Sequence, residues 1–255
     1  MGNFSYYGIK TIIFQKIKEF FYEFQYTIIA TLISTFIFVL IMSTISNYYS
    51  IIVEEDNYLE FIVPGIVMMI VMQVSYQNIS ESLIFMKQIG SFNDYLLSPI
   101  SRLEIFISFI IASIFIGVFI GLINIFFLNI FVKFDFINYY KVIYYLIITS
   151  LIFSSLGSIV GFLFYTWDLQ QSVYNFIVIP ISFLSGTFFS INSVNLKWIL
   201  LFKINPFYQL VNNFRHSFKN EQNINFNVEI QILFVSFIIL FISIIVFKKG
   251  YKVIY

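Results

Sequence analysis

Long apolar runs with almost no charge make up most of this chain and constrain what it can fold into. A helix needs about 20 consecutive, mainly apolar residues to cross the hydrocarbon core of a bilayer. The runs are continuous rather than alternating, which favours helices over the strands of a membrane barrel. The sequence therefore predicts an all-α membrane protein, a single membrane domain over residues 1–255. Its six transmembrane helices are expected at about residues 26–46, 61–80, 105–131, 142–166, 172–191 and 230–247.

The composition of the chain excludes several other classes of protein. With 60% hydrophobic and 11% charged residues, it fits no ordinary soluble domain. Lys and Arg (14) nearly balance Asp and Glu (13), so the basic footprint of a nucleic-acid-binding protein is missing. The chain has no Cys and a single His, which leaves no thiolate or His-rich metal site. We therefore expect no nucleic-acid partner and no metal in this chain.

Charges at the ends of the predicted spans indicate the orientation in the membrane. Lys10, Lys16 and Lys18 precede the first span, and a further basic cluster begins at Lys248 after the last. The loop at 47–60 carries acidic residues and neither Lys nor Arg. Cytoplasmic flanks are enriched in Lys and Arg, and six spans put both termini on one side. Both termini are therefore predicted to be cytoplasmic.

Residues 6–24, ahead of the first span, are predicted to form an amphipathic helix in the membrane interface. Large apolar side chains recur there at helical spacing, and charged side chains occupy the other side. The helix is either an anchor or a support for a partner. Its apolar positions are Ile9, Ile12, Ile13, Ile17, Phe20, Phe21 and Phe24.

The fifth predicted span is interrupted, and short re-entrant helices are expected between it and the sixth. Pro180 should kink the span, and the Ser-Gly-Thr sequence at 185–187 is a weak point soon after. Asn205 and Pro206 suit the N-cap and first residue of a later short helix. The segments 192–196 and 198–202 are too short to span. The charged residues of this outer region, expected at the level of the lipid headgroups, are Arg215, His216 and Lys219.

Residues 81–104 form the longest predicted inner connection. A short helix is expected over Ser91–Leu97, with Ser91 as a possible cap, Asp94 in the first turn and Pro99 ending it. It is polar enough to leave the bilayer, yet it carries Phe92, Tyr95, Leu96 and Leu97. Two interpretations are open: a docking element for a soluble partner, or a loop whose apolar side chains pack on the membrane surface.

Two patterns inside the spans concern packing and polarity. Gly117 and Gly121, and likewise Gly157 and Gly161, form G-x-x-x-G pairs, which we expect to serve helix packing within the chain. The second span ends on the polar run 73–78, which would be costly facing lipid. This run either makes hydrogen bonds between helices or lines a substrate path.

Four motifs occur in order at spacings that are similar to those of a known family. They are Phe61-Ile-Val-Pro-Gly-Ile-Val-Met-Met, Asn93-Asp-Tyr-Leu-Leu-Ser-Pro-Ile, Leu184-Ser-Gly-Thr-Phe-Phe-Ser, and Ile204-Asn-Pro-Phe-Tyr with the later Arg215. In these motifs, and over nearly its whole length, the chain resembles type-2 ABC exporter permeases. The likeness is to the bacterial inner-membrane transport permeases of that family.

The resemblance implies an ATP-driven exporter in the bacterial inner membrane, in which permeases pair as dimers and each binds one ATPase subunit. A second permease copy, as a homodimer, and an ABC ATPase are the implied partners, and the ATPase would bind ATP and Mg. The resemblance places coupling to the ATPase on Glu81, Lys87, Gly90, Ser91, Phe92, Asp94, Tyr95, Leu96, Leu97, Pro99 and Arg102. In the outer re-entrant segment it marks Gly186, Asn205, Pro206 and Arg215.

The ATPase itself is not found in this sequence. A phosphate-binding loop ends in Gly-Lys-Ser/Thr, and none of the 10 glycines is followed by Lys. The chain is therefore predicted to be a permease subunit without cofactor or enzymatic activity of its own. The alternative is an ion-coupled secondary transporter, but such proteins carry ionisable groups within their spans, and none lies deep in a predicted span here. A membrane enzyme is disfavoured because no paired acids or zinc motif is present and His216 reads as an interfacial residue.

Overall fold

A computed structural model of the protein describes residues 6–49, 52–53, 56–132, 134, 137–190, 202, 204–219 and 226–249. The described part of the chain is mainly helical. It also contains one pair of short antiparallel strands, β1 (Ile52–Val53) and β2 (Asp56–Asn57). The helices are α1 (Tyr6–Tyr22), α2 (Phe24–Tyr49), α3 (Tyr58–Gln88), α4 (Phe92–Leu97), α5 (Arg102–Leu128), α6 (Tyr139–Leu163), α7 (Trp167–Val173), the π-helical η1 (Tyr174–Val178), α8 (Ile179–Leu184), α10 (Pro206–His216) and α11 (Phe226–Lys249).

Five of the described helices are long and apolar enough to cross a membrane, namely α2, α3, α5, α6 and α11. They coincide with five of the six predicted spans. The longest is α3, whose 31 residues extend about 46 Å, well beyond the ~30 Å hydrocarbon core. The helix therefore continues past residue 80, the predicted end of the second span. Glu81 and Lys87 lie on the last turns of α3 instead of in a loop.

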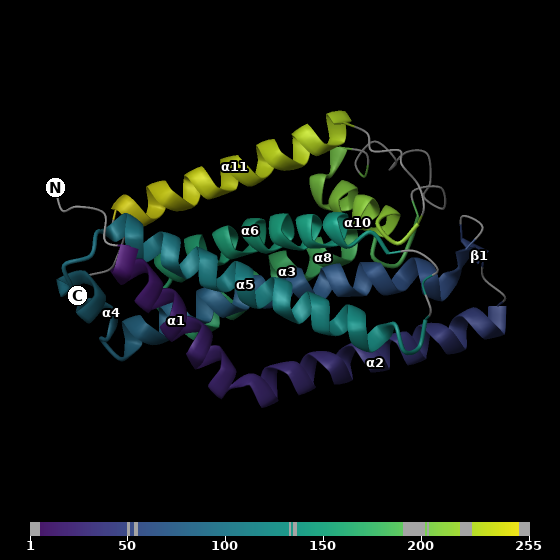
Figure 1. Ribbon diagram of the computed structural model, residues 1–255, viewed down its shortest axis with the longest axis horizontal. Helices are drawn as coiled ribbons and strands as arrows, with labels where there is room; N and C mark the ends of the chain where they lie inside the picture. The colour runs from purple at the N-terminus through teal and green to yellow at the C-terminus, as the bar shows by residue number, and fades with distance from the viewer. Residues whose placement is uncertain are drawn as a thin grey trace.

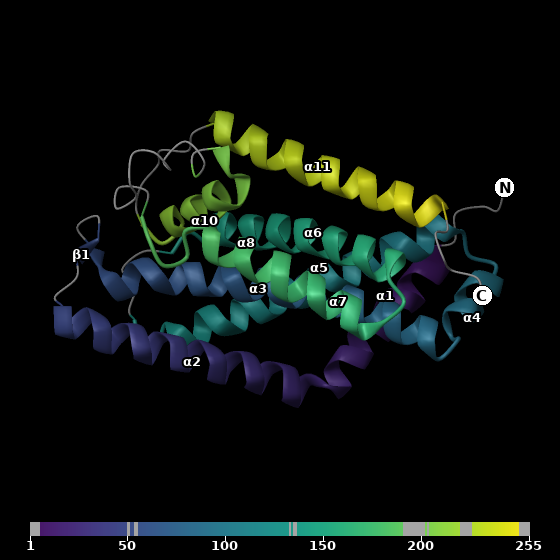
Figure 2. The ribbon, with the colours of Figure 1, turned by 180° about the vertical axis from the view of Figure 1, so that it is seen from behind.

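The bundle is built around α3 (Figures 1 and 2). In the most apolar window of α3, 78% of the residues are buried, compared with 17% in α2 and 22% in α11. The outward faces of α2 and α11 carry large exposed apolar side chains such as Ile33, Ile37, Phe234 and Phe237. This distribution suits a central helix enclosed by protein and two peripheral helices that face lipid.

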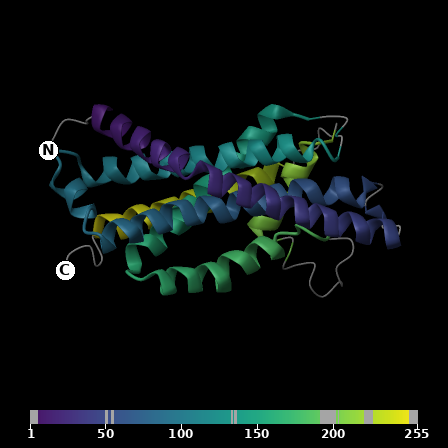
Figure 3. The same cartoon turned by 90° about the horizontal axis from the view of Figure 1, so that it is seen from below.

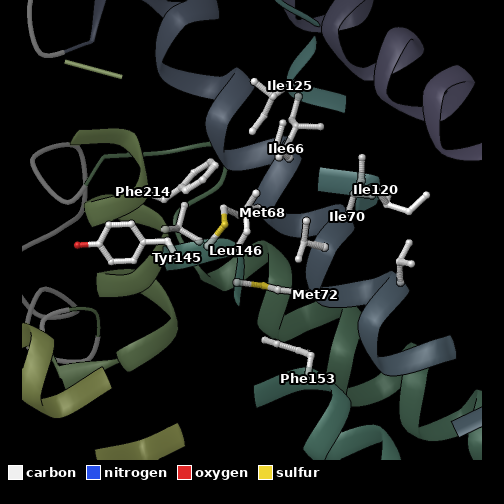
Figure 4. Close-up of a cluster of buried hydrophobic side chains, with 14 of the residues drawn as sticks. Ile66, Met68, Ile70, Met72, Ile120, Ile125, Tyr145, Leu146, Phe153 and Phe214 are labelled. Carbon is white, nitrogen blue, oxygen red and sulfur yellow. The ribbon is translucent and has the colours of Figure 1, made fainter. Parts of the chain in front are cut away.

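The core lies where α3, α5, α6 and α10 meet (Figure 4). Because lipid is as apolar as these side chains, their contribution comes from close packing more than from transfer out of water. The residues labelled there are Ile66, Met68, Ile70 and Met72 of α3, Ile120 and Ile125 of α5, Tyr145, Leu146 and Phe153 of α6, and Phe214 of α10.

The predicted amphipathic helix at 6–24 is confirmed as α1, which packs along α5 (Figure 3). Ile9, Ile12 and Phe20 are buried, as the spacing predicts, whereas Phe21 remains 44% exposed. Lys16 also faces inward, so the buried side of α1 is not purely apolar. A bend at Glu23 separates α1 from α2, and the two helices point in different directions.

The fifth predicted span, 172–191, is not one regular helix. Helical structure runs from Trp167 to Leu184, about 27 Å at 1.5 Å per residue, and it changes from α to π and back. Pro180 cannot donate a backbone hydrogen bond, and the π turn immediately before it, closed by the Ile179 N–H donating to Tyr174, accommodates that loss. The helix ends just before the predicted weak point, where Gly186 has φ +74°.

The short helix predicted after Asn205 is confirmed as α10. The Asn205 side chain accepts a hydrogen bond from the Phe207 N–H (3.0 Å), and Pro206 is the first residue. The predicted segments 192–196 and 198–202 lie outside the described residues, except Phe202.

Both G-x-x-x-G pairs pack within the chain, as the spacing predicts. A Cβ atom added at Gly157 would overlap the backbone carbonyl oxygen of Tyr76 on α3, and one at Gly161 would come within 2.9 Å of Leu83. On α5, a Cβ at Gly121 would come within 2.9 Å of Val71. The glycines therefore allow the α5 and α6 backbones to approach α3 closely.

Replacing Gly157 by Val should destabilise the protein by about 1–3 kcal/mol, because the new side chain meets fixed α3 backbone rather than a movable side chain. The measurement is the melting midpoint of the detergent-solubilised protein. Ala30→Val adds similar bulk at an exposed position of α2 and serves as the matched control. Equal midpoints for the two variants would show that α3 and α6 are not in this close contact.

Candidate functional site

The predicted coupling helix is α4, and the turn before it depends on Gly90. Gly90 adopts φ +76°, a conformation that side chains disfavour, and it lies in the turn between α3 and α4. Ser91 stands at the N-cap position, but its side chain makes no capping bond, so this detail of the prediction is wrong. The helix ends as predicted, because Ser98 is extended ahead of Pro99.

One side of α4 is anchored and the other is exposed. The ring of Phe92 is buried against Phe162 (centroids 5.9 Å apart), and Tyr95 packs on Phe109 (5.9 Å). Burial also raises the pKa of the Tyr95 phenol, which therefore stays protonated. Leu96 is partly buried, whereas Leu97 is 85% exposed. The anchors leave Leu97 as a large apolar side chain on a fixed, exposed helix.

The start of α5 is fixed by a capping box that the sequence prediction missed. The Ser101 hydroxyl accepts from the Glu104 N–H (3.3 Å), and the Glu104 carboxylate accepts from the Ser101 N–H (2.6 Å). The sequence signal, Ser-x-x-Glu before an apolar run, was present at 101–104. Pro99 and Arg102 are exposed beside this turn and do not join the anchored side of α4.

A cavity of about 1020 Å³ opens at this end of the bundle, between α1, the last half of α3, α4 and the first residue of α7. It brings together four of the predicted coupling residues: Glu81, Ser91, Asp94 and Tyr95. Further lining residues include Lys16, Glu19, Glu23, Gln77, Asn78, Ser82, Phe85 and Trp167. The contribution of α1 to this wall was not predicted, because an amphipathic pattern does not reveal which helix it will cover.

Charge in the cavity is mainly acidic. Lys16 Nζ is held by the Glu19 carboxylate (2.6 Å) and also donates to Ser82 Oγ (3.1 Å). Glu23, Glu81 and Asp94 add negative charge around the same space. The lining of the cavity is thus mixed, with polar side chains on α3 and aromatic side chains such as Phe20, Phe85 and Trp167.

The side chains of the polar run at the end of the second predicted span lie in two different environments. Ser75 and Tyr76 are fully buried and bind neighbouring helices: Ser113 Oγ donates to the Ser75 carbonyl (3.0 Å), and the Tyr76 hydroxyl donates to the Gln170 carbonyl (3.4 Å). Gln77 and Asn78 instead line the cavity.

Lys87, another predicted coupling residue, is turned away from the cavity and buried. Its Nζ donates to the carbonyl oxygens of Phe162 (2.8 Å) and Phe164 (3.0 Å), at the end of α6. Helix C-termini leave carbonyl groups unpaired and favour positive charge. Lys87 therefore binds the protein interior instead of presenting its charge to a partner.

At the opposite end of the bundle, Arg215 of α10 joins three segments. Its guanidinium donates to the carbonyl oxygens of Phe61 (2.9 Å), Thr187 (3.0 Å) and Gly186, and lies 3.8 Å from the centroid of the Phe61 ring. We call Arg215 and these three carbonyl groups the outer clasp. Arg215 is only 5% exposed, so protein encloses its side chain.

Arg215→Lys should lower the melting midpoint nearly as much as Arg215→Met. The compact lysine ammonium cannot reproduce the planar guanidinium, whose separated N–H groups bind carbonyl groups of two different segments. Hydrogen bonds to a charged group contribute about 1.5–3 kcal/mol, which sets the expected loss. Lys10→Met, at an exposed position of α1, is the control. If Arg215→Lys melts like the unmutated protein, only the charge matters and the geometry of the clasp does not.

Comparison with known proteins gives the family. A family model described as ABC-2 type transporter matches residues 7–219. Similar proteins include the inner membrane transport permease YadH of Escherichia coli (strain K12) and that of Shigella flexneri. Each is 24% identical over 222 residues, which cover 86% of this chain and 85% of the relative. In this family ATP is generally bound by a partner ATPase. The chain therefore belongs to the ABC-2 type transporter family, and it is a membrane permease, a non-catalytic subunit of an ABC transporter.

Proposed function

We propose that two copies of this permease form the translocation path of an ATP-driven exporter in the bacterial inner membrane. Each copy binds one ATPase subunit, which holds ATP and Mg, through α4. The observation that carries the proposal is α4 itself, a short helix fixed by Phe92 and Tyr95 that exposes 85% of Leu97. A large apolar side chain held in place on an exposed helix is suited to serve as the anchor of a docking contact.

Each copy contributes six spans with both termini in the cytoplasm, and the continuous helical stretch Trp167–Leu184 serves as the fifth. One end of the bundle contains α4, the start of α1 and the end of α11 (Figure 1). Both α1 and the end of α11 carry lysines, and cytoplasmic flanks are enriched in Lys and Arg, which supports a cytoplasmic location for this end. In this orientation the acidic cavity opens to the cytoplasm. The outer clasp and α10, as the re-entrant helix, lie on the outer side.

The path runs along the polar stripe of α3 and the adjacent edge of α7. Gln73, Gln77 and Glu81 follow one another at intervals of one turn on α3, and all three are partly exposed. Trp167 of α7 lines the cavity, and Gln171 of α7 and Asn175 of η1 follow it at the same spacing, both exposed. Polar side chains at this depth are costly against lipid, which supports an aqueous path completed by the second copy.

Leu97→Asp should raise the Kd for the ATPase at least about tenfold, which corresponds to a loss of ~1.4 kcal/mol in binding free energy. The reason is that the substitution puts a charge at the centre of the docking surface. Binding is measured by titrating the ATPase, obtained by co-expression, against the permease in nanodiscs. Tyr140→Asp is the matched control, since Tyr140 is 91% exposed at the opposite end of the bundle. Unchanged affinity for Leu97→Asp, or an equal loss for Tyr140→Asp, would contradict docking through α4.

Single cysteines should map both the orientation and the path, because the chain has no Cys of its own. A membrane-impermeant maleimide added to spheroplasts should label Tyr140→Cys but not Gln77→Cys. In inside-out vesicles the order should reverse. Phe237→Cys, on the exposed apolar face of α11, should react slowly in both. Labelling of Gln77→Cys from outside only would reverse the orientation, and slow labelling from both sides would exclude an aqueous cavity there.

A further inference from the structure

The connection between α6 and α7 is fastened to the end of α3 through two consecutive residues. Lys87, 6% exposed, donates to the carbonyl groups of Phe162 and Phe164, and its ammonium lies 5.6 Å from the centroid of the Phe162 ring. In return, the Tyr165 hydroxyl donates to the Lys87 carbonyl (3.2 Å). The side chain and the backbone carbonyl group of Lys87 thus both bind the end of α6 and the connection that follows it.

Gln88 extends the attachment to the first residue of α7. Its Nε2 donates to the Tyr165 carbonyl (3.3 Å), and its Oε1 accepts from the Trp167 indole N–H (2.6 Å). Lys87 and Gln88 are the last two residues of α3, and only the Gly90 turn separates them from α4. The base of α7 is therefore held at the same corner that positions the coupling helix.

The adjacent side chains reinforce this corner. Phe92 of α4 packs on Phe162, and Phe162 packs edge-on against Phe247 of α11 (4.4 Å). Higher up, Gln170 Nε2 donates to Ser80 Oγ (3.1 Å), and Tyr174 stacks on Tyr76 (6.0 Å), so α7 follows α3 along its length. In Figure 3, α7 and α8 lie on the side of the bundle away from α1 and α5.

We infer that Lys87 and Gln88 are positioning residues for transport: they fasten the α6–α7 connection to the α3–α4 corner, so that α4 and α7 move as one unit. This rests on the proposed function, in which the ATPase displaces α4. The displacement then reaches Trp167 and Gln171 of α7 and Asn175 of η1, which form the part of the path wall on this side. Nucleotide binding on the partner would thus change the path wall without a separate contact between the ATPase and α7.

The test compares two cysteine reporters, Asn93→Cys on α4 and Gln171→Cys on α7, both at exposed positions. In the complex with the ATPase in nanodiscs, the rate of labelling by an impermeant maleimide is measured with and without a non-hydrolysable ATP analogue. We expect the labelling rate at both reporters to change by roughly threefold or more when the ATP analogue binds, because the analogue shifts the population between two conformations of the complex. In a Lys87→Met background, the change at Asn93→Cys should persist and the change at Gln171→Cys should be lost.

Two further variants separate positioning from folding. Lys87→Arg keeps a buried cationic donor and should restore the response at Gln171→Cys. Trp167→Phe keeps an aromatic side chain but removes the hydrogen bond to Gln88. It should reduce that response while the melting midpoint stays close to the unmutated value. If the response at Gln171→Cys is undiminished in both Lys87→Met and Trp167→Phe, the inference is overturned. If neither reporter responds in the unmutated complex, the proposed coupling through α4 fails as well.

Discussion

Close contact between helix backbones holds the other elements in place around α3. Within lipid, helices gain little from hiding apolar surface from one another, so contact distance and interhelical hydrogen bonds decide their association. On α5, a Cβ at Gly117 would overlap the hydroxyl groups of Ser75 and Ser150, and Gly157 brings α6 onto the α3 backbone in the same way. Because α3 is enclosed so tightly, it is a fixed support for α4 at one end and α10 at the other.

Two buried cations, at opposite ends of the bundle, are accommodated by the same chemistry. Lys87 binds carbonyl groups at the end of α6, and Arg215 binds carbonyl groups just after α8. Carbonyl groups at a helix C-terminus lack intrahelical donors. A buried cation supplies these donors, and the carbonyl groups in turn stabilise its charge. In both places the cation connects α3 to a segment distant in sequence, and these two segments lie just before and just after the helical stretch Trp167–Leu184.

The parts of the structure that depend on local pattern were predictable, and those that depend on which segments meet were not. Five spans, the amphipathic α1, the break after Leu184 and the Asn205 cap follow from apolar length, periodicity and capping preferences. Lys87 and Arg215 were singled out by position, but their burial depends on carbonyl groups some 30–150 residues away in sequence, for which no local signal exists. The cavity is likewise formed by residues from several elements, including α1, α3, α4 and α7, so single patterns indicated its polar residues but not that they meet.

The π-helical segment η1 gives the second half of the proposed fifth span, Trp167–Leu184, a different rotational setting from the first half. Successive residues of an α-helix are offset by about 100°, so one extra residue in a turn rotates everything that follows by that angle. With the extra residue present, Gln170 meets Ser80 below η1 and Ser182 receives a hydrogen bond from Gln73 above it (3.3 Å). Both halves therefore present a polar side chain to the same helix. Loss of one residue between Tyr174 and Val178 would turn Ser182 away from α3 while leaving the length of the span almost unchanged.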